Sequence, residues 1–193
     1  IGDKHIPWIH NLRDTDAAVG VDDELPVRLI RLFNEAAGRA TLVEAGVLPE
    51  TVAKLDLLGI SGVGNLVAAI KFAKYYELGE DEVVFTMFTD SMAMYGSRLA
   101  EMNAERGAYT QRQADRDLDM LMGLSVDHVL ELSQVDKRRV HQLKYFTWVE
   151  QLGKGVDELR AQWNGHREYW GGLRSQVGAL DAMIEEFNAE VLG

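Results

Sequence analysis

The feature that most constrains this chain of 193 residues is a glycine-lined turn that leads into a helix-like stretch and then into a run of β-formers. The turn is Gly59-Ile60-Ser61-Gly62, and the run of β-formers covers residues 83–88. The run ends in Thr89-Asp90-Ser91, a cluster of hydroxyl and carboxyl groups. Ligands bind beyond the carboxyl ends of strands in open α/β sheets, often beside a glycine-rich turn that opens a helix. This order of elements predicts an α/β domain with a ligand site at the cluster.

Charge and composition exclude several functional classes. The net charge is -11, which disfavours nucleic acid, because binding to a phosphate backbone depends on Lys and Arg. The absence of cysteine excludes disulfides, thiolate metal sites and cysteine nucleophiles. No apolar run approaches the roughly 18 residues that cross a bilayer, and the N-terminus lacks a signal-peptide layout. We therefore expect a soluble, cytoplasmic protein that binds neither nucleic acid nor membrane.

Strand and helix signals alternate in the first half of the chain. Residues 17–21 are typical of a short buried strand, and residues 22–38 of a helix that acidic residues cap. Residues 61–79 predict a second helix that ends at a C-cap glycine. Residues 83–88 then predict a strand buried on both faces. This alternation implies that the strands pair in parallel.

The composition changes after Leu99, where strand signals vanish and helix-compatible segments follow one another. We expect residues 1–105 to form the α/β core and residues 106–193 a helical extension. The extension carries large aromatic residues, which need a partner that buries them. That partner is either the α/β core or a second subunit.

Four motifs follow one another in an order typical of one enzyme family. They are Ile1-Gly2-Asp3-Lys4-His5-Ile6-Pro7, the strand and helix over 19–39, Gly59-Ile60-Ser61-Gly62, and Thr89-Asp90-Ser91 with Tyr95. This order resembles the C-terminal portion of fold-type II (tryptophan synthase β-like) pyridoxal-phosphate-dependent enzymes of the cysteine synthase and cystathionine β-synthase type. The resemblance covers about half of the chain, residues 1–99. It implies a parallel-sheet domain, pyridoxal 5'-phosphate as cofactor, and β-elimination or β-replacement on a serine- or cysteine-type amino acid.

The resemblance also implies the cofactor contacts, which are Gly59, Ile60, Ser61, Thr89 and Ser91. The hydroxyl of Ser91 takes the position that faces the pyridine nitrogen. A hydroxyl there leaves the nitrogen largely unprotonated, which suits β-elimination and β-replacement.

Two alternatives remain open at this site. Asp90 competes with Ser91 for the pyridine nitrogen, although alternation along a strand puts the two side chains on opposite sides. We expect Asp90 instead to cap the helix that contains Tyr95 and Leu99. The turn has a purely structural interpretation as well, with Ser61 as a helix N-cap and the glycines needed for close packing.

The opening loop departs most from the family pattern. Gly2, Asp3, Lys4 and His5 are expected on the substrate side of the site, where cysteine synthases carry small and apolar residues. The charge of this loop predicts a polar or anionic co-substrate. Alternatively, Lys4 and His5 are only solvated loop residues.

Two parts of the family's site have no counterpart in this sequence. The lysine that holds the cofactor and the glycine-rich phosphate loop both lie upstream of these motifs in the family, whereas Lys71 and Lys74 follow the third motif. We therefore expect no catalytic residue in this chain, which would act with an N-terminal portion of the same enzyme as a separate chain. We expect that assembled unit to form a homo-oligomer. The histidines lack ligand spacing, so no metal site is expected.

Two other functions remain open. The chain could be a non-catalytic binding or assembly subunit that retains the fold of the enzyme. It could also be an unrelated α/β domain, which an absence of parallel pairing between the segments around Val19 and Val84 would favour.

Overall fold

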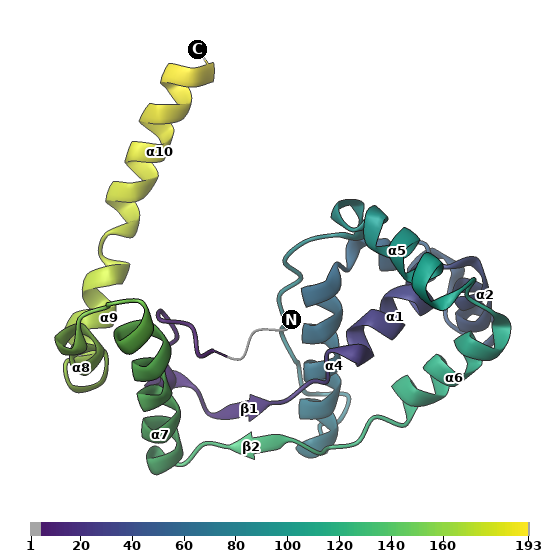
Figure 1. The fold of residues 1–193 in the computed structure, drawn as a ribbon, viewed down its shortest axis with the longest axis horizontal. Coiled ribbons are helices and arrows are strands. Elements are labelled where there is room, and N and C mark those ends of the chain that lie inside the picture. The colour runs from purple at the N-terminus through teal and green to yellow at the C-terminus, as the bar shows by residue number, and fades with distance from the viewer. Residues whose placement is uncertain (1–4, 193) are drawn as a thin grey trace. The chain divides into compact units, whose positions relative to one another are not determined.

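The computed structural model describes residues 5–192, and these are mostly helical rather than α/β (Figure 1). Their sheet has two strands, β1 (Ala17–Val19) and β2 (Val129–Glu131). Gly20 N–H donates to the His128 carbonyl over 2.8 Å, and Leu132 N–H donates to the Asp16 carbonyl over 2.8 Å. The strands therefore run antiparallel, and the predicted parallel-sheet α/β domain is wrong.

The chain divides into two units. The first unit comprises residues 18–130, and the second comprises the described residues 5–17 together with 131–192. The helices of the first unit are α1 (Glu24–Asn34), α2 (Ala36–Glu44), α3 (Pro49–Val52), α4 (Ile60–Tyr75), α5 (Gly96–Arg106) and α6 (Gln111–Met122). Those of the second unit are α7 (Gln134–Lys144), the π-helical turn η4 (Tyr145–Gln151), α8 (Val156–Asn164), α9 (His166–Arg174) and α10 (Val177–Leu192). Short 3-10 turns are η1 (Leu12–Asp14), η2 (Leu55–Leu57) and η3 (Met92–Met94).

Helix α1 lies at the centre of the first unit, where it packs against α2, α4 and α6. Its residues Leu29, Ile30 and Leu32 are fully buried. The predicted helix over 22–38 is two helices, because Glu35 is extended (φ -85°, ψ 149°) and separates α1 from α2. A Cβ on Gly38 would lie 2.1 Å from the Leu32 carbonyl oxygen. Gly38 thus serves the close approach of α2 to α1 instead of ending a helix.

The predicted strand over residues 83–88 is absent. Val83 is 90% exposed and Phe85 84% exposed, although both have high β propensity. The segment is held to α4 by a side chain, since Asn65 Nδ2 donates to the Met87 carbonyl over 2.8 Å. A strand needs a neighbouring strand to complete its hydrogen bonds, and this segment has none among the described residues.

Helical structure dominates after Leu99, as the sequence indicates, and β2 is the exception. Residue 106, where the helical extension was expected to begin, is the last residue of α5. Helix α6 follows it and packs on α2 within the first unit. None of the helices in the described part of the chain combines the length and apolar character that crossing a membrane requires.

The second unit is built around a buried lysine. Lys144 is 0% exposed, and its Nζ donates to the carbonyls of Trp8 (2.8 Å) and His10 (2.6 Å) and to Gln162 Oε1 (2.8 Å). The Trp170 ring centroid lies 5.9 Å from the same ammonium. This lysine therefore ties residues 8–10 to α7 and α8.

Candidate functional site

Two of the predicted site segments meet in the first unit. Gly59 is the N-cap of α4, and its N–H donates to the Asp90 carbonyl over 2.9 Å. A Cβ on Gly59 would lie 2.1 Å from Asp90 Oδ1 and 3.0 Å from the Asp90 carbonyl oxygen. A larger residue here would displace the Asp90 carboxylate, which supports the packing role that the sequence left open for Gly59. Ser61 is the second residue of α4 and not its N-cap.

The carboxylate of Asp90 is held by two hydroxyl groups. Tyr95 Oη donates to Oδ2, and Thr89 Oγ1 donates to Oδ1 over 3.3 Å. The hydrogen bond to Asp90, followed by burial and the charge of Asp90, raises the pKa of Tyr95, which keeps this phenol protonated as a donor. Asp90 caps no helix: Ser91 is the N-cap of η3, and Tyr95 is the N-cap of α5. The expectation of a capping Asp90 is wrong.

Ser91 differs from its neighbours because its hydroxyl makes no hydrogen bond within residues 5–192. Its backbone is extended (φ -118°, ψ 166°), and its side chain is half-buried. Strand alternation does not separate Ser91 from Asp90, because residues 83–88 form no strand. The two residues differ in their hydrogen bonds: the Asp90 carboxylate accepts two, whereas the Ser91 hydroxyl is available to a ligand.

The lysines of α4 donate hydrogen bonds to backbone carbonyls away from this site. Lys71 is 6% exposed, and its Nζ donates to the Gly20 carbonyl over 2.8 Å. Lys74 Nζ donates to the Leu124 carbonyl. At about 1.5 Å of rise per residue, Lys71 lies roughly 16 Å along the helix from Ile60. Neither lysine therefore serves the N-terminal turn of α4.

The opening loop is described only in part. Gly2, Asp3 and Lys4, predicted on the substrate side, lie outside the described residues. His5 belongs to the second unit, where its Nδ1 lies 2.8 Å from Thr147 Oγ1. Gly59, Ile60, Ser61, Thr89 and Ser91 belong to the first unit.

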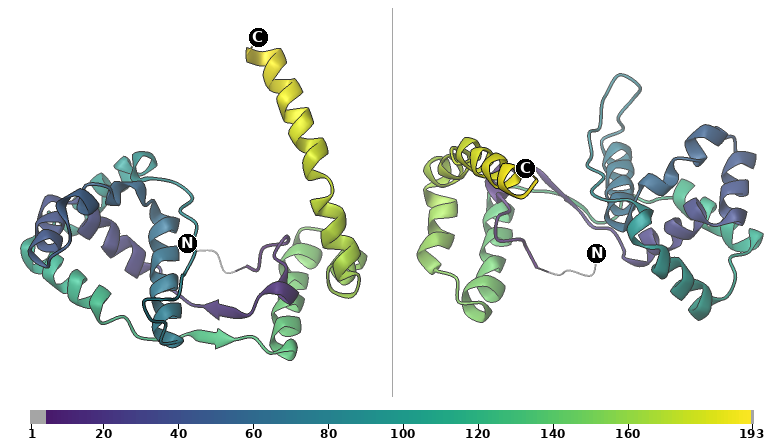
Figure 2. Two further views of the ribbon diagram at one scale, coloured as in Figure 1. Left: turned by 180° about the vertical axis from the view of Figure 1, so that it is seen from behind. Right: turned by 90° about the horizontal axis from the view of Figure 1, so that it is seen from above.

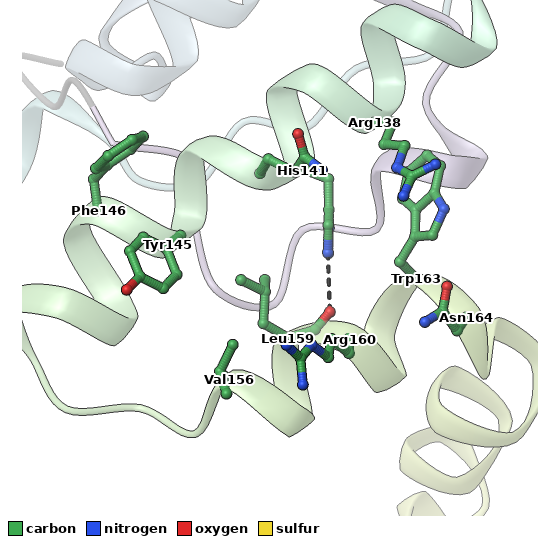
Figure 3. Close-up of a pocket in the computed structure, with 10 residues that line it drawn as sticks. Arg138, His141, Tyr145, Phe146, Val156, Leu159, Arg160, Trp163 and Asn164 are labelled. Atoms are coloured by element: carbon green, nitrogen blue, oxygen red, sulfur yellow. Dashed lines mark hydrogen bonds between the residues drawn. The ribbon is translucent and has the colours of Figure 1, made fainter.

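Sequence reasoning missed a pocket of about 400 Å³ in the second unit, between α7, η4 and α8 (Figure 3). Its wall includes His141, whose Nε2 lies 3.0 Å from the Leu159 carbonyl oxygen. Burial lowers the pKa of His141, and the charge of Lys144 adds a smaller effect in the same direction. The hydrogen bond to Leu159 opposes this shift. The helical spacing of Arg138 and Gln142 on α7 and of Tyr145 at the start of η4 is the sequence signal that could have revealed one wall.

No group of three or more His, Asp or Glu side chains within residues 5–192 is arranged to hold a metal ion. No protein-family model matches the sequence, and no curated protein or solved structure matches it at a significant level. Function must therefore be inferred from the residues themselves.

Proposed function

We propose that this chain is the C-terminal portion of a pyridoxal-phosphate-dependent enzyme that catalyses β-elimination or β-replacement on a serine- or cysteine-type amino acid. One observation carries the proposal: residues 89–91 are seated on the N-terminal turn of α4 through the bond from Gly59 N–H to the Asp90 carbonyl. The two motifs are far apart in the sequence and become neighbours in the first unit. Among the described residues the segments around Val19 and Val84 do not pair in parallel, which favours an unrelated domain. The proposal therefore rests on the contact between these two motifs and on their order along the chain.

The donors at this place suit an anionic cofactor that carries a pyridine ring. The amides of Ile60, Ser61 and Gly62 begin α4 and have no acceptor within the helix. The N-terminus of a helix of this length also favours negative charge. The hydroxyls of Ser61 and Ser91 make no hydrogen bond within the described chain and add neutral donors.

Ser91 and Asp90 have different roles in this proposal. Bound pyridoxal phosphate supplies the electron sink that allows an amino acid to lose its α-proton and a β-substituent. Ser91 would hydrogen-bond the pyridine nitrogen and leave it neutral. Tyr95 and Thr89 already donate to the Asp90 carboxylate, which leaves the Ser91 hydroxyl as the side-chain group available to the nitrogen.

The lysine and the phosphate loop would come from an N-terminal portion of the enzyme. Both α4 lysines donate to backbone carbonyls away from this turn, so the proposal gives neither of them this role. The exposed apolar side chains of residues 83–88 offer a surface on which that portion could pack, with Val83 90%, Phe85 84% and Met87 62% exposed. We place the assembly in the cytoplasm as a homo-oligomer. The same surface favours a second candidate, a non-catalytic assembly subunit.

The deciding experiment is the isolation of the native particle through an affinity tag on this chain. We expect a companion polypeptide, a visible absorption band that borohydride abolishes, and the reduced cofactor on a lysine of the companion. A companion without cofactor would favour the assembly subunit. A tagged chain that is alone and colourless after addition of pyridoxal phosphate would rule out both roles for it.

A substitution in the same particle tests the assignment of Ser91. Ser91→Ala should lower elimination activity and alter the visible band, because the neutral partner of the pyridine nitrogen is lost. Ser97→Ala is the matched control, since Ser97 is exposed on α5 and has no hydrogen bond within the described chain. Equal effects of the two substitutions would remove Ser91 from the site.

A further inference from the structure

Helix α10 presents an apolar stripe to solvent. All residues over 171–191 are exposed, and in Figures 1 and 2 α10 continues beyond α9, clear of α7 and α8. Apolar residues recur every three or four positions, which places them on one face of the helix. We define the α10 stripe as Val177, Leu180, Ile184, Phe187 and Val191, which are between 50% and 64% exposed. An exposed apolar stripe of this kind is typical of a surface that binds another protein segment.

The charges of α10 are all negative. Asp181, Glu185, Glu186 and Glu190 lie within the helix, which has no Lys or Arg. At 100° per residue, Asp181 and Glu190 flank the stripe on opposite sides. A surface that binds this helix should therefore have an apolar centre flanked by basic residues.

The second unit carries a surface of that description. Two hollows adjoin there, because Arg138, Gln142 and Trp163 line both. We define the α7–α8 groove as these residues together with Val135, Phe146, Val156 and Arg160. Val135 is 77% exposed and Phe146 56% exposed, so the groove is apolar and open. Figure 3 shows Arg138, Trp163, Phe146 and Val156 around the first hollow.

Two arginines of the groove are available to pair with carboxylates of a binding partner. Arg138 makes no ion pair or hydrogen bond within the described chain. Arg160 pairs with Asp157 over 3.1 Å, but the two side chains are 68% and 91% exposed. Such exposed pairs contribute little and exchange partners readily. The α7–α8 groove is thus the charge complement of α10.

We propose that α10 of one copy docks in the α7–α8 groove of a second copy, and that the contact is reciprocal. Direct pairing of two α10 helices would bring acidic residues together, whereas the groove brings them to Arg138 and Arg160. If each stripe residue buries roughly 60 Å² and the groove a like area, two reciprocal sites bury on the order of 1,200 Å², which is the lower end for specific interfaces. The interface uses the second unit alone and is independent of the cofactor proposal.

Charge reversal in the full chain tests this interface by sedimentation equilibrium. The wild-type chain should form a dimer that weakens as salt is raised. Arg138→Glu with Arg160→Glu should raise the dimer Kd by roughly tenfold or more, and Asp181→Arg with Glu190→Arg should do the same. All four changes together should restore much of the affinity. Arg167→Glu, an exposed arginine of α9 outside the groove, is the matched control.

Photo-crosslinking separates the possible occupants of the groove. With p-benzoylphenylalanine at position 187 in a mixture of isotope-labelled and unlabelled chains, we expect crosslinks between copies that map to residues 134–163. Crosslinks between two α10 helices, crosslinks within one chain, or a monomer at all concentrations would each overturn the proposal. Tryptophan fluorescence of every variant verifies that the second unit is folded.

Discussion

Two buried cations, Arg31 in the first unit and Lys144 in the second, are held in different ways. In the first unit Arg31 is 3% exposed, pairs with Glu35 over 3.4 Å and donates to Asn103 and to the Gly107 carbonyl. In the second unit Lys144 is 0% exposed and meets only neutral acceptors. A buried charge without a counter-ion is held at a cost in free energy. The second unit should therefore respond to pH through Lys144.

The cores differ accordingly. The apolar cluster that joins α1, α2, α4 and α6 lies wholly in the first unit. In the second unit the buried side chains include the polar groups of His141, Lys144 and Gln162. All four tryptophans belong to the second unit, so their fluorescence reports that unit alone. Hydrogen exchange by mass spectrometry reports both units separately.

The largest effect should come from the first unit's core. Leu32 is fully buried in α1, so Leu32→Ala should cost about 3–5 kcal/mol through lost burial and the cavity left behind. Hydrogen exchange should rise throughout α1, α2, α4 and α6, while the tryptophan unfolding midpoint stays unchanged. Leu48→Ala is the control, since Leu48 is 60% exposed. An equal shift of the tryptophan midpoint would mean that the units unfold as one block, and the comparison would fail.

A somewhat smaller loss is expected from Lys144→Met in the second unit. Methionine leaves the carbonyls of Trp8 and His10 and the amide of Gln162 without their donor, which should lower the free energy of unfolding by about 2–3 kcal/mol. Tryptophan fluorescence in urea measures the change. Arg167→Met is the control, because Arg167 is exposed in the same unit and has no hydrogen bond or ion pair within the described chain. A more stable variant would show that the buried charge outweighs its hydrogen bonds.

The sequence predicted helices well where local signals suffice. Helix α4 begins within one residue of the predicted start at Ser61, because an apolar face and a glycine-lined turn are both local features. The predicted end at a C-cap Gly79 is wrong, since α4 ends at Tyr75 and its C-cap is Tyr76. It also predicted that helices dominate after Leu99. The break at Glu35 was missed, since Gly38 suggested the end of a helix and in fact serves contact between two helices.

The predicted strand failed for a reason that no local pattern contains. Residues 83–88 have the propensity of a buried strand, but strand formation depends on a partner elsewhere in the chain or in another chain. The strand signal at 17–21 did find a partner, β2, which the sequence analysis had not identified. For the site, order along the chain predicted that Gly59 and residues 89–91 belong together. It could not predict that Tyr95 and Thr89 engage Asp90, because that depends on side-chain placement.

Gly59→Ala should produce a moderate effect confined to the candidate site. The new Cβ would meet Asp90 Oδ1 at 2.1 Å and the Asp90 carbonyl oxygen at 3.0 Å, so the carboxylate must rotate away from Tyr95 and Thr89, at a cost of about 1–2 kcal/mol. Hydrogen exchange should rise at residues 89–95 and not in the second unit. Gly96→Ala is the matched control, because no atom lies within 4 Å of its Cβ position. Equal exchange in both variants would contradict the steric role of Gly59.

The smallest predicted effect is the pH dependence of the second unit. Burial lowers the pKa of Lys144 to about 8, whereas an unfolded lysine has a pKa of about 10.4. Between these values the unfolded state binds more protons, so the free energy of unfolding rises with pH, by roughly 1 kcal/mol from pH 7 to pH 9. Urea unfolding followed by tryptophan fluorescence at the two pH values measures this rise, and hydrogen exchange of the first unit supplies the comparison. In Lys144→Met the rise should vanish. A rise of the same size in that variant would assign the pH dependence to other groups, and the two units would then no longer differ in how they hold buried charge.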